Sequence, residues 1–184
     1  NAVLITDRVL GGADTWATSQ TIAGALRKLE YDIIITGRQA IDGDTAQVGP
    51  QIAEKLHLPQ VTYAGEVAKE GESLIIKRML EDGYMLVKVP TPCMITCIKE
   101  LNTPRYMSVI GTEKCWDMPL KIMDFAALEN HPLIDKTTIG LKGSPTNIYK
   151  SFTPPVKGGG MMLEGSDKNT TDELVSILTD KHII

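Results

Sequence analysis

Two continuous apolar runs dominate the hydrophobic pattern of the first third of the chain. "AVLIT" (2–6) and "DIIIT" (32–36) are rich in β-branched residues, which is typical of strands buried on both faces. Between them, apolar residues recur at roughly helical spacing over 15–30, and Asp14 stands where an N-cap belongs. The pattern predicts a strand, a helix and a second strand, with the two strands paired in parallel through a right-handed crossover.

The pattern changes after the next predicted helix, "QIAEKLHLP" (51–59). Pro50 is either the first residue of that helix or lies inside a helix that began near Thr45. A strand follows from Gln60, and then β-rich runs flank Glu81–Asp82–Gly83, in which Asp-Gly signals a hairpin turn. We therefore expect an antiparallel hairpin added to a parallel sheet.

The C-terminal part has the composition of a linker followed by one helix. "FTPPVKGGGMMLEGS" (152–166) is rich in proline and glycine, as linkers are. In the last stretch Thr171 is the expected cap, and Leu174, Ile177 and Leu178 form an apolar stripe. A single helix has too small a core to fold alone, so we expect it to dock on its own domain or on a partner.

Composition and charge exclude some functions. The chain of 184 residues is 42% hydrophobic and 23% charged, with a formal charge of -4, so we expect no nucleic-acid partner. No apolar run is long enough for a bilayer and the first residues show no export signal, so we expect no membrane insertion and a cytoplasmic location. Cys93 and Cys97 share one face of a strand, and we interpret them as small buried hydrophobic residues rather than a redox pair or ligand set.

The candidate binding groups lie in loops after the two apolar strands, in "TDRVLGGADT" (6–15) and "GRQAIDGDTAQVGP" (37–50). Ligands of doubly wound sheets bind at such strand ends, where glycines allow close approach and helix N-termini favour phosphate. The side chains that could bind a nucleotide are Thr15, Thr18, Thr45 and Gln47 as neutral hydrogen-bonding groups, and Asp42 or Asp44 as acceptors. The pattern is neither GxGxxG nor a P-loop, and a turn followed by a capped helix explains it equally well.

The sequence shows no catalytic acid, base or nucleophile. His57, His131 and His182 are scattered, "GSP" (143–145) is interpreted as a turn, and no cluster has metal-ligand spacing. Any chemistry is therefore expected to belong to a bound cofactor.

Three long motifs resemble signature regions of the β subunit of electron transfer flavoproteins: "DRVLGGADTWATSQTIAGAL" (7–26), "GRQAIDGDTAQVGPQIAEKLHLPQVTY" (37–63) and "ELNTPRYMSVIG" (100–111). The resemblance implies an α/β fold with an incomplete doubly wound, Rossmann-like sheet, an added antiparallel hairpin and a C-terminal helical arm. It implies that 1–153 is the C-terminal part of the nucleotide-binding domain, that 154–184 is a linker and arm packing on the α subunit, and that the family's opening strands and helices are missing here.

The resemblance also implies the cofactor. In the family this loop wraps an adenine nucleotide, which is AMP in housekeeping members and a second FAD in electron-bifurcating members. The sequences of residues 43–49 and of "GGADTWATS" (11–19) are similar to those of electron-bifurcating members. This resemblance favours FAD over AMP. The residues implied to bind it are Thr15, Thr18, Gly37, Arg38, Gln39, Ala40, Ile41, Asp42, Gly43, Asp44, Thr45, Ala46, Gln47 and Val48, with no catalytic or metal-binding residue.

The partners implied are an α subunit that carries FAD, NADH as electron donor, ferredoxin or flavodoxin as one acceptor, and an acyl-CoA dehydrogenase as the other. Asn102 to Gly111 matches the family's dehydrogenase-recognition loop, with Val109 where housekeeping members have a leucine. Met79 stands where the mitochondrial pattern has a glutamate that contacts the α subunit. The alternatives are a non-bifurcating β subunit with structural AMP, which shuttles single electrons from acyl-CoA dehydrogenases, and a nucleotide-sensing module without redox work.

Overall fold

The computed structural model describes residues 1–156 and 158–184. They fall into two compact units, Asn1–Asn147 and Ile148–Ile184. The predicted linker at 152–166 includes Lys157, which lies outside the described residues. The predicted domain boundary at 153/154 stays a prediction, since the described residues of 148–167 contain neither helix nor strand to mark it.

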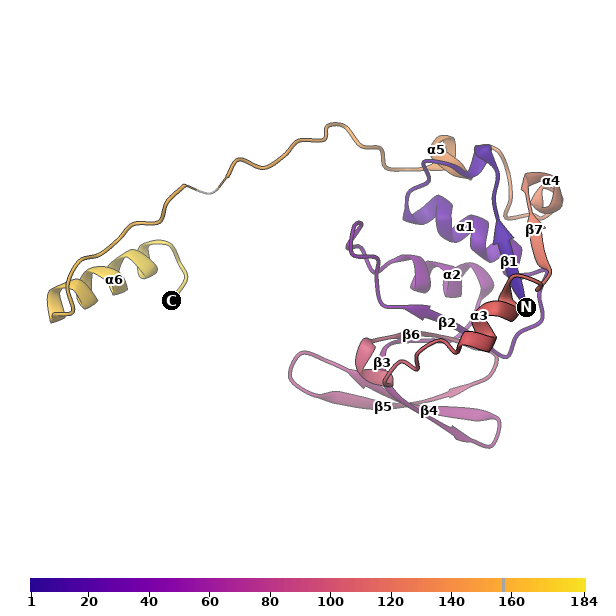
Figure 1. Cartoon of the computed structure of the whole chain (residues 1–184), viewed down its shortest axis with the longest axis horizontal. Helices are drawn as coiled ribbons and strands as arrows, with labels where there is room; N and C mark the ends of the chain where they lie inside the picture. Colours follow the sequence, from indigo (N-terminus) through magenta and orange to yellow (C-terminus); the bar gives the residue numbers. More distant parts are fainter. Residues whose placement is uncertain (157) are drawn as a thin grey trace. The chain divides into compact units, whose positions relative to one another are not determined.

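A five-stranded mixed sheet forms the base of unit 1 (Figure 1). In sheet order its strands are β2 (Ile33–Gly37), β6 (Cys93–Cys97), β3 (Gln60–Glu70), β4 (Ser73–Met79) and β5 (Tyr84–Pro90). The strands β2 and β3 run parallel to β6, whereas β4 is antiparallel to both β3 and β5. The predicted α/β class and the hairpin around Asp82–Gly83 are confirmed, but the run after the turn is two strands, because β6 returns to the parallel part of the sheet.

The first predicted strand pairing is wrong. The strand β1 (Ala2–Ile5) pairs in parallel with β7 (Leu120–Met123) in a separate two-stranded sheet, and β2 pairs with β6. The expectation of full burial is also wrong, since Leu4 is 42% and Ile35 is 64% exposed. Within the described part of the chain each of the two strands has a hydrogen-bonded neighbour on one edge only. An apolar run indicates a strand that favours burial, but it does not specify the neighbour on either edge.

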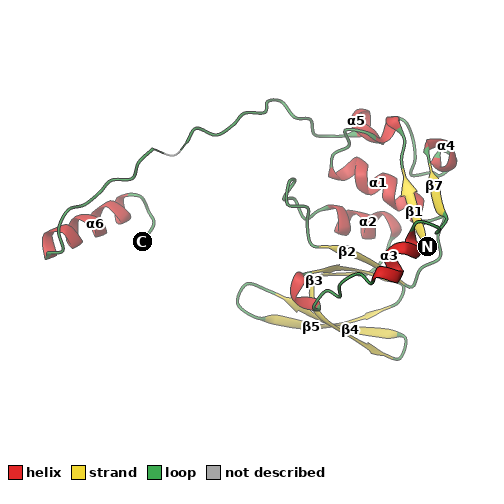
Figure 2. Ribbon diagram, in the orientation of Figure 1, coloured by secondary structure: helices red, strands yellow, loops and turns green. Residues whose placement is uncertain are grey.

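Two helices cover the parallel end of the larger sheet (Figure 2). They are α1 (Thr15–Leu26) and α2 (Val48–Leu56), and both contribute to a buried cluster with Ile34 and Met94. The predicted cap of α1 is confirmed, because the Asp14 carboxylate accepts a hydrogen bond from the Ala17 N–H. Pro50 lies inside α2, which begins at Val48, so the second of the two alternatives for this helix is the closer one.

The remaining elements of unit 1 are short: η1 (Arg8–Leu10), η2 (Lys99–Leu101), α3 (Val109–Cys115), α4 (Phe125–Leu128) and α5 (Gly140–Gly143). Cys93 is fully buried in the β3–β6 core, and Cys97 packs against the same cluster. This confirms their interpretation as small hydrophobic residues. Burial raises the pKa of both thiols, which keeps them protonated.

Among the described residues of unit 2 the helix is α6 (Lys168–Asp180). Its N-cap is Asp167, whose carboxylate accepts the Thr170 N–H, so the predicted cap at Thr171 is wrong. The Thr171 hydroxyl instead donates to the Asp167 carbonyl inside the first turn, because the carboxylate already occupies the capping position. Of the helices in the described ranges, none is long and apolar enough to cross a bilayer.

Candidate functional site

The predicted loop leaves the carboxyl end of β2 and enters α2, and most of it is exposed to solvent. Ile41, at its tip, is 99% exposed although it is apolar. The loop is held by its own hydrogen bonds: the Asp44 N–H donates to the Ala40 carbonyl, and the Gln39 amide links the Asp44 carboxylate to Arg38 Nε. The predicted residues 37–48 therefore lie together as one shaped surface rather than inside the core.

The last residues of this loop have an unusual backbone. Asp44 and Ala46 adopt left-handed conformations, with φ of 49° and 52°, and Gln47 returns to the right-handed region. A left-handed residue followed by a right-handed one turns successive N–H groups toward the same side, which forms a concavity for anions. The conformation is unfavourable for residues with a Cβ, so it is held at an energetic cost.

The described residues provide no side-chain cap at the N-terminus of α2, which we call open, whereas the N-terminus of α1 is capped. Asp14 caps α1 with its carboxylate, but Gln47 provides no side-chain cap for α2 among the described residues. The N–H groups of Val48 and Gly49 thus lack an intrahelical partner, and Pro50 has no N–H to satisfy. An anion is accordingly favoured at α2 and not at α1, although the sequence treated the two loops alike.

Two side-chain hydrogen bonds join the first turns of these helices. The Thr15 hydroxyl donates to Gln47 Oε1 at 2.9 Å, and the Ser19 hydroxyl donates to Gln51 Oε1 at 3.0 Å. The other predicted residue of this turn, Thr18, is half-buried beside them. The sequence analysis missed Ser19 and Gln51; the available signal was a pair of polar residues four apart at the start of each helix.

Space for a ligand remains in front of the loop. A Cβ added at Gly43 would meet no heavy atom of the described chain within 4 Å, and the same holds for Gly37. An uncapped helix end, converging N–H groups and open space fit the phosphate of a nucleotide. The loop residues and the N-terminus of α2 can therefore hold a phosphate, and Thr15 of α1 is joined to them by its hydrogen bond to Gln47.

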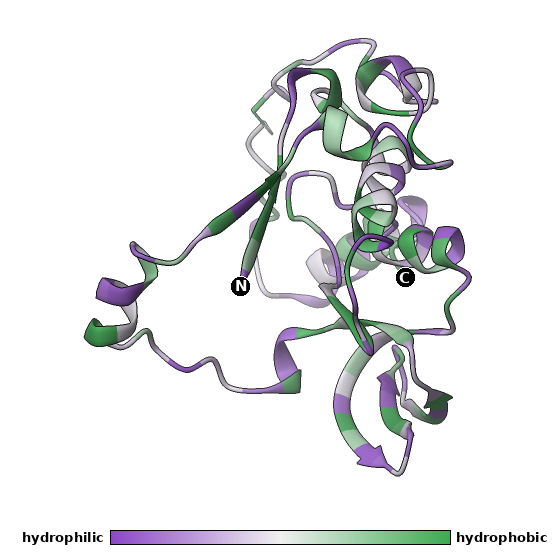
Figure 3. Ribbon diagram, turned by 90° about the vertical axis from the view of Figure 1, so that its right-hand side faces the viewer, coloured by the Kyte–Doolittle hydropathy of each residue, from purple (hydrophilic) through white to green (hydrophobic). Residues whose placement is uncertain are grey.

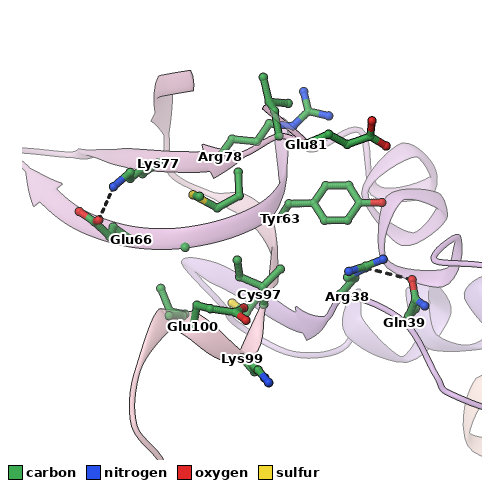
Figure 4. Close-up of a pocket in the computed structure, with 15 residues that line it drawn as sticks. Arg38, Gln39, Tyr63, Glu66, Lys77, Arg78, Glu81, Cys97, Lys99 and Glu100 are labelled. Atoms are coloured by element: carbon green, nitrogen blue, oxygen red, sulfur yellow. Dashed lines mark hydrogen bonds and ion pairs between the residues drawn. The ribbon is translucent and has the colours of Figure 1, made fainter. Parts of the chain in front are cut away.

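A cavity of the described chain lies beside this loop rather than in it. It has a volume of about 1140 Å³ and takes only Arg38 and Gln39 from the predicted residues. In Figure 4 the Tyr63 ring points toward Arg38, whose guanidinium is 5.3 Å from the ring centroid. Tyr63 lies at an irregularity in the pairing of β3 and has a φ of 57°, so a β-bulge directs the ring into the cavity. Sequence periodicity carried no signal for this bulge.

The charges of the cavity are only partly paired. Lys77 forms an ion pair with Glu66 at 2.7 Å, and Arg78 Nε is buried with no hydrogen-bond partner among the described residues. No group of three or more His, Cys, Asp or Glu side chains that could hold a metal ion occurs within 1–156 and 158–184.

Comparison with known proteins assigns the class. The model of the electron transfer flavoprotein domain matches residues 1–119 of the chain. The chain belongs to the electron transfer flavoprotein family, as its motifs implied, and the fold described above is consistent with this.

The similar proteins are subunits of electron-transfer complexes. The chain is 57% identical over 188 residues to the acryloyl-CoA reductase electron transfer subunit gamma of Anaerotignum propionicum. This alignment covers 100% of the chain and 70% of that protein. It is 51% identical over 183 residues to the electron transfer flavoprotein subunit beta of Clostridium acetobutylicum, with 100% and 69% covered. Subunit CarD of the caffeyl-CoA reductase-Etf complex of Acetobacterium woodii is 48% identical over 185 residues, with 100% and 69% covered. Within the family the chain is thus a β-type subunit.

Proposed function

We propose that this β subunit holds FAD in the loop 37–48 and takes part in electron bifurcation together with an α subunit. NADH is the electron donor, and ferredoxin or flavodoxin and an acyl-CoA dehydrogenase are the two acceptors. The observation that carries the proposal is the N-terminus of α2, which follows the left-handed Ala46 and has no side-chain cap among the described residues, because it offers a phosphate the N–H groups of Val48 and Gly49. The proposed complex works in the cytoplasm.

The residues of the chain have separate tasks in this site. The N–H groups of Val48 and Gly49 bind a phosphate, and the Thr15–Gln47 pair holds the two helix ends at a fixed separation. Asp42 and Asp44 are placed on the exposed side of the loop, where carboxylates accept from ribose hydroxyls. A bound flavin supplies the redox chemistry, since it accepts two electrons and releases them singly, and the protein supplies binding and orientation.

Two features favour FAD over AMP. The space in front of Gly43 is open, and the Thr15 hydroxyl, bonded to Gln47, adds a polar side chain from α1 next to the phosphate position. Two of the similar proteins are named as electron-transfer subunits of acryloyl-CoA reductase and of a caffeyl-CoA reductase complex, which suggests similar work here. The second candidate is a single-electron carrier with structural AMP, because the α2 terminus alone suffices for one phosphate.

A nucleotide count separates the two candidates. The chain is purified with its α subunit, the complex is denatured, and released FAD and AMP are quantified by chromatography. Two FAD and no AMP per heterodimer support the proposal, and reduction of the β-site flavin by NADH then completes the test. One FAD and one AMP would replace bifurcation with single-electron transfer.

A substitution at Gly43 tests the position of the site. Gly43→Trp places a large side chain where an added Cβ meets no heavy atom of the described chain within 4 Å, so we expect loss of the β-site nucleotide with the α-site FAD and the fold retained. The matched control is Gly83→Trp, in the β4–β5 turn, where an added Cβ also meets nothing of the described chain within 4 Å. Equal β-site occupancy in the two variants, measured by the same chromatography, would mean that the loop is not the site.

A further inference from the structure

The segment 138–147, "TIGLKGSPTN", packs on the loop that leads into α1, with α5 beside the start of that helix (Figure 1). The Leu141 N–H donates to the Gly11 carbonyl at 3.0 Å. Gly140 has a φ of +59°, and a Cβ added there would lie 1.9 Å from the Val9 carbonyl oxygen. The two backbones thus approach more closely than any side chain would allow, which fixes the segment against the loop.

The segment is hydrogen-bonded to the N-cap of α1, Asp14. Its N–H donates to the Ser144 hydroxyl at 2.8 Å, and that hydroxyl in turn donates to the Gly140 carbonyl. Asp14 Oδ2 accepts from both the N–H and the hydroxyl of Thr146, at 3.0 and 2.8 Å. Asp14 Oδ1 remains for the Ala17 N–H, which is the helix cap itself.

Capping α1 requires only Oδ1, so the two bonds from Thr146 have another effect. They fix the orientation of the carboxylate and of the backbone that continues into Thr15, the residue whose hydroxyl reaches Gln47. Hydrogen bonds to a charged acceptor are stronger than neutral ones, so they restrict this first turn more than an ordinary cap does. The orientation of Thr15 therefore depends on residues far along the chain.

We propose that Ser144 and Thr146 are positioning residues of the nucleotide site. They do not touch the ligand; they hold Asp14, and through it Thr15, where the Thr15–Gln47 bond sets the spacing between α1 and the open end of α2. The proposal rests on the nucleotide site proposed above. It also gives a role in ligand retention to "GSP" (143–145), interpreted from the sequence as a turn, and to Thr146, which follows it.

The experiment measures how fast the β-site nucleotide leaves the purified heterodimer. The complex is loaded with radiolabelled FAD, or AMP if that is what the wild type contains, and is chased with the unlabelled compound. Thr146→Val removes the hydroxyl donor at nearly constant volume, and Thr146→Ser restores it. The matched control is Thr137→Val, because Thr137 also donates its N–H and its hydroxyl to one exposed carboxylate, that of Asp135.

We expect Thr146→Val to speed dissociation roughly tenfold, as the loss of one charge-assisted hydrogen bond permits. Thr146→Ser should return to within about twofold of the wild type, and Thr137→Val should match the wild type, since Asp135 does not contact the site. The thermal midpoint of the nucleotide-free complex should be equal in the two valine variants, which separates positioning from a general loss of stability.

Two outcomes overturn the proposal in different ways. Unchanged dissociation in Thr146→Val, or equal acceleration in Thr137→Val, overturns the positioning role and leaves the nucleotide site standing. A wild-type complex that releases only the α-subunit FAD on denaturation overturns the nucleotide site, and the positioning role with it.

Discussion

At the scale of single residues, Asp14 connects the cap of a helix to a distant segment, and its ionisation follows from these contacts. Partial burial raises the pKa of Asp14, but hydrogen bonds from Ala17 and Thr146 outweigh it and hold that pKa below the usual 3.8. Because the folded-state pKa is depressed, the carboxylate contributes its stability above the unfolded-state pKa. That contribution is lost as the pH falls through the folded-state pKa.

The prediction at this scale concerns Asp14→Asn. At pH 7 we expect the variant complex to be destabilised by about 1 kcal/mol, because the Asn Oδ1 can still cap Ala17 but its NH2 group cannot accept from Thr146. Between pH 5 and about 3 the wild type should lose stability more steeply than the variant, which has no carboxylate to protonate there. Thermal unfolding across this range checks both points. Asp82→Asn, in the β4–β5 turn, is the control, and a variant with the wild-type pH slope would contradict the prediction.

At the scale of elements, local signals were sufficient where one short stretch decides the structure. The Asp14 cap fixed the start of α1, and Asp82–Gly83 fixed the hairpin. Strand neighbours were not predictable, because the partner of β1 is β7, more than a hundred residues away, and apolar composition is the same for either pairing. The helical spacing predicted for α1 included Ile22 and Leu26, which pack against the buried cluster, but its most buried apolar residues are small ones such as Ala17 and Ala23, which that spacing did not indicate.

The residues of the candidate site also fall into those that local sequence predicts and those that depend on distant residues. The loop 37–48 was visible because its glycines and polar side chains are consecutive. Ser19, Gln51 and Thr146 were not, since each acts through a hydrogen bond to a residue at least thirty positions away. Tyr63 depends on a bulge, which arises from strand register and leaves no trace in a single sequence.

The segment between η2 and β7 leads to a prediction at the same scale. It bows out from the rest of unit 1 (Figure 3), Tyr106 is fully exposed, and Val109 at the start of α3 is 86% exposed. Apolar side chains gathered on an exposed segment indicate a contact surface. We propose this segment as the contact for the dehydrogenase, in which Tyr106 becomes buried. Tyr106→Ala should then raise the KM for the dehydrogenase by roughly tenfold, because buried tyrosines contribute strongly to interfaces.

The measurement for this segment is electron transfer to the acyl-CoA dehydrogenase, alongside reduction of the complex by NADH. The NADH step should be unchanged in Tyr106→Ala. Leu86→Ala, at an exposed apolar position on β5, is the control and should alter neither step. Impaired reduction by NADH with normal dehydrogenase coupling would refute the assignment of the segment.

At the scale of the whole molecule, unit 2 has a helix without a core. No residue of α6 is buried, although all of this helix is described, and Val175 is 48% exposed. A helix of 13 residues is marginal in water by itself, so its apolar stripe needs a surface to cover it. We propose the α subunit as that surface, in agreement with the arm implied by the family resemblance.

The last prediction compares neighbouring residues of α6 within the intact chain. Leu174→Asp places a charge on the apolar stripe and should weaken assembly with the α subunit by roughly tenfold, because a buried carboxylate loses its hydration without gaining a partner. Ser176→Asp adds the same charge two positions along, so its effect on the helix dipole is similar but it leaves the stripe intact. Titration of the labelled chain with α subunit measures both dissociation constants. Equal constants for the two variants would show that the stripe does not face the α subunit, and the surface that covers α6 would then lie within the chain itself or on another partner.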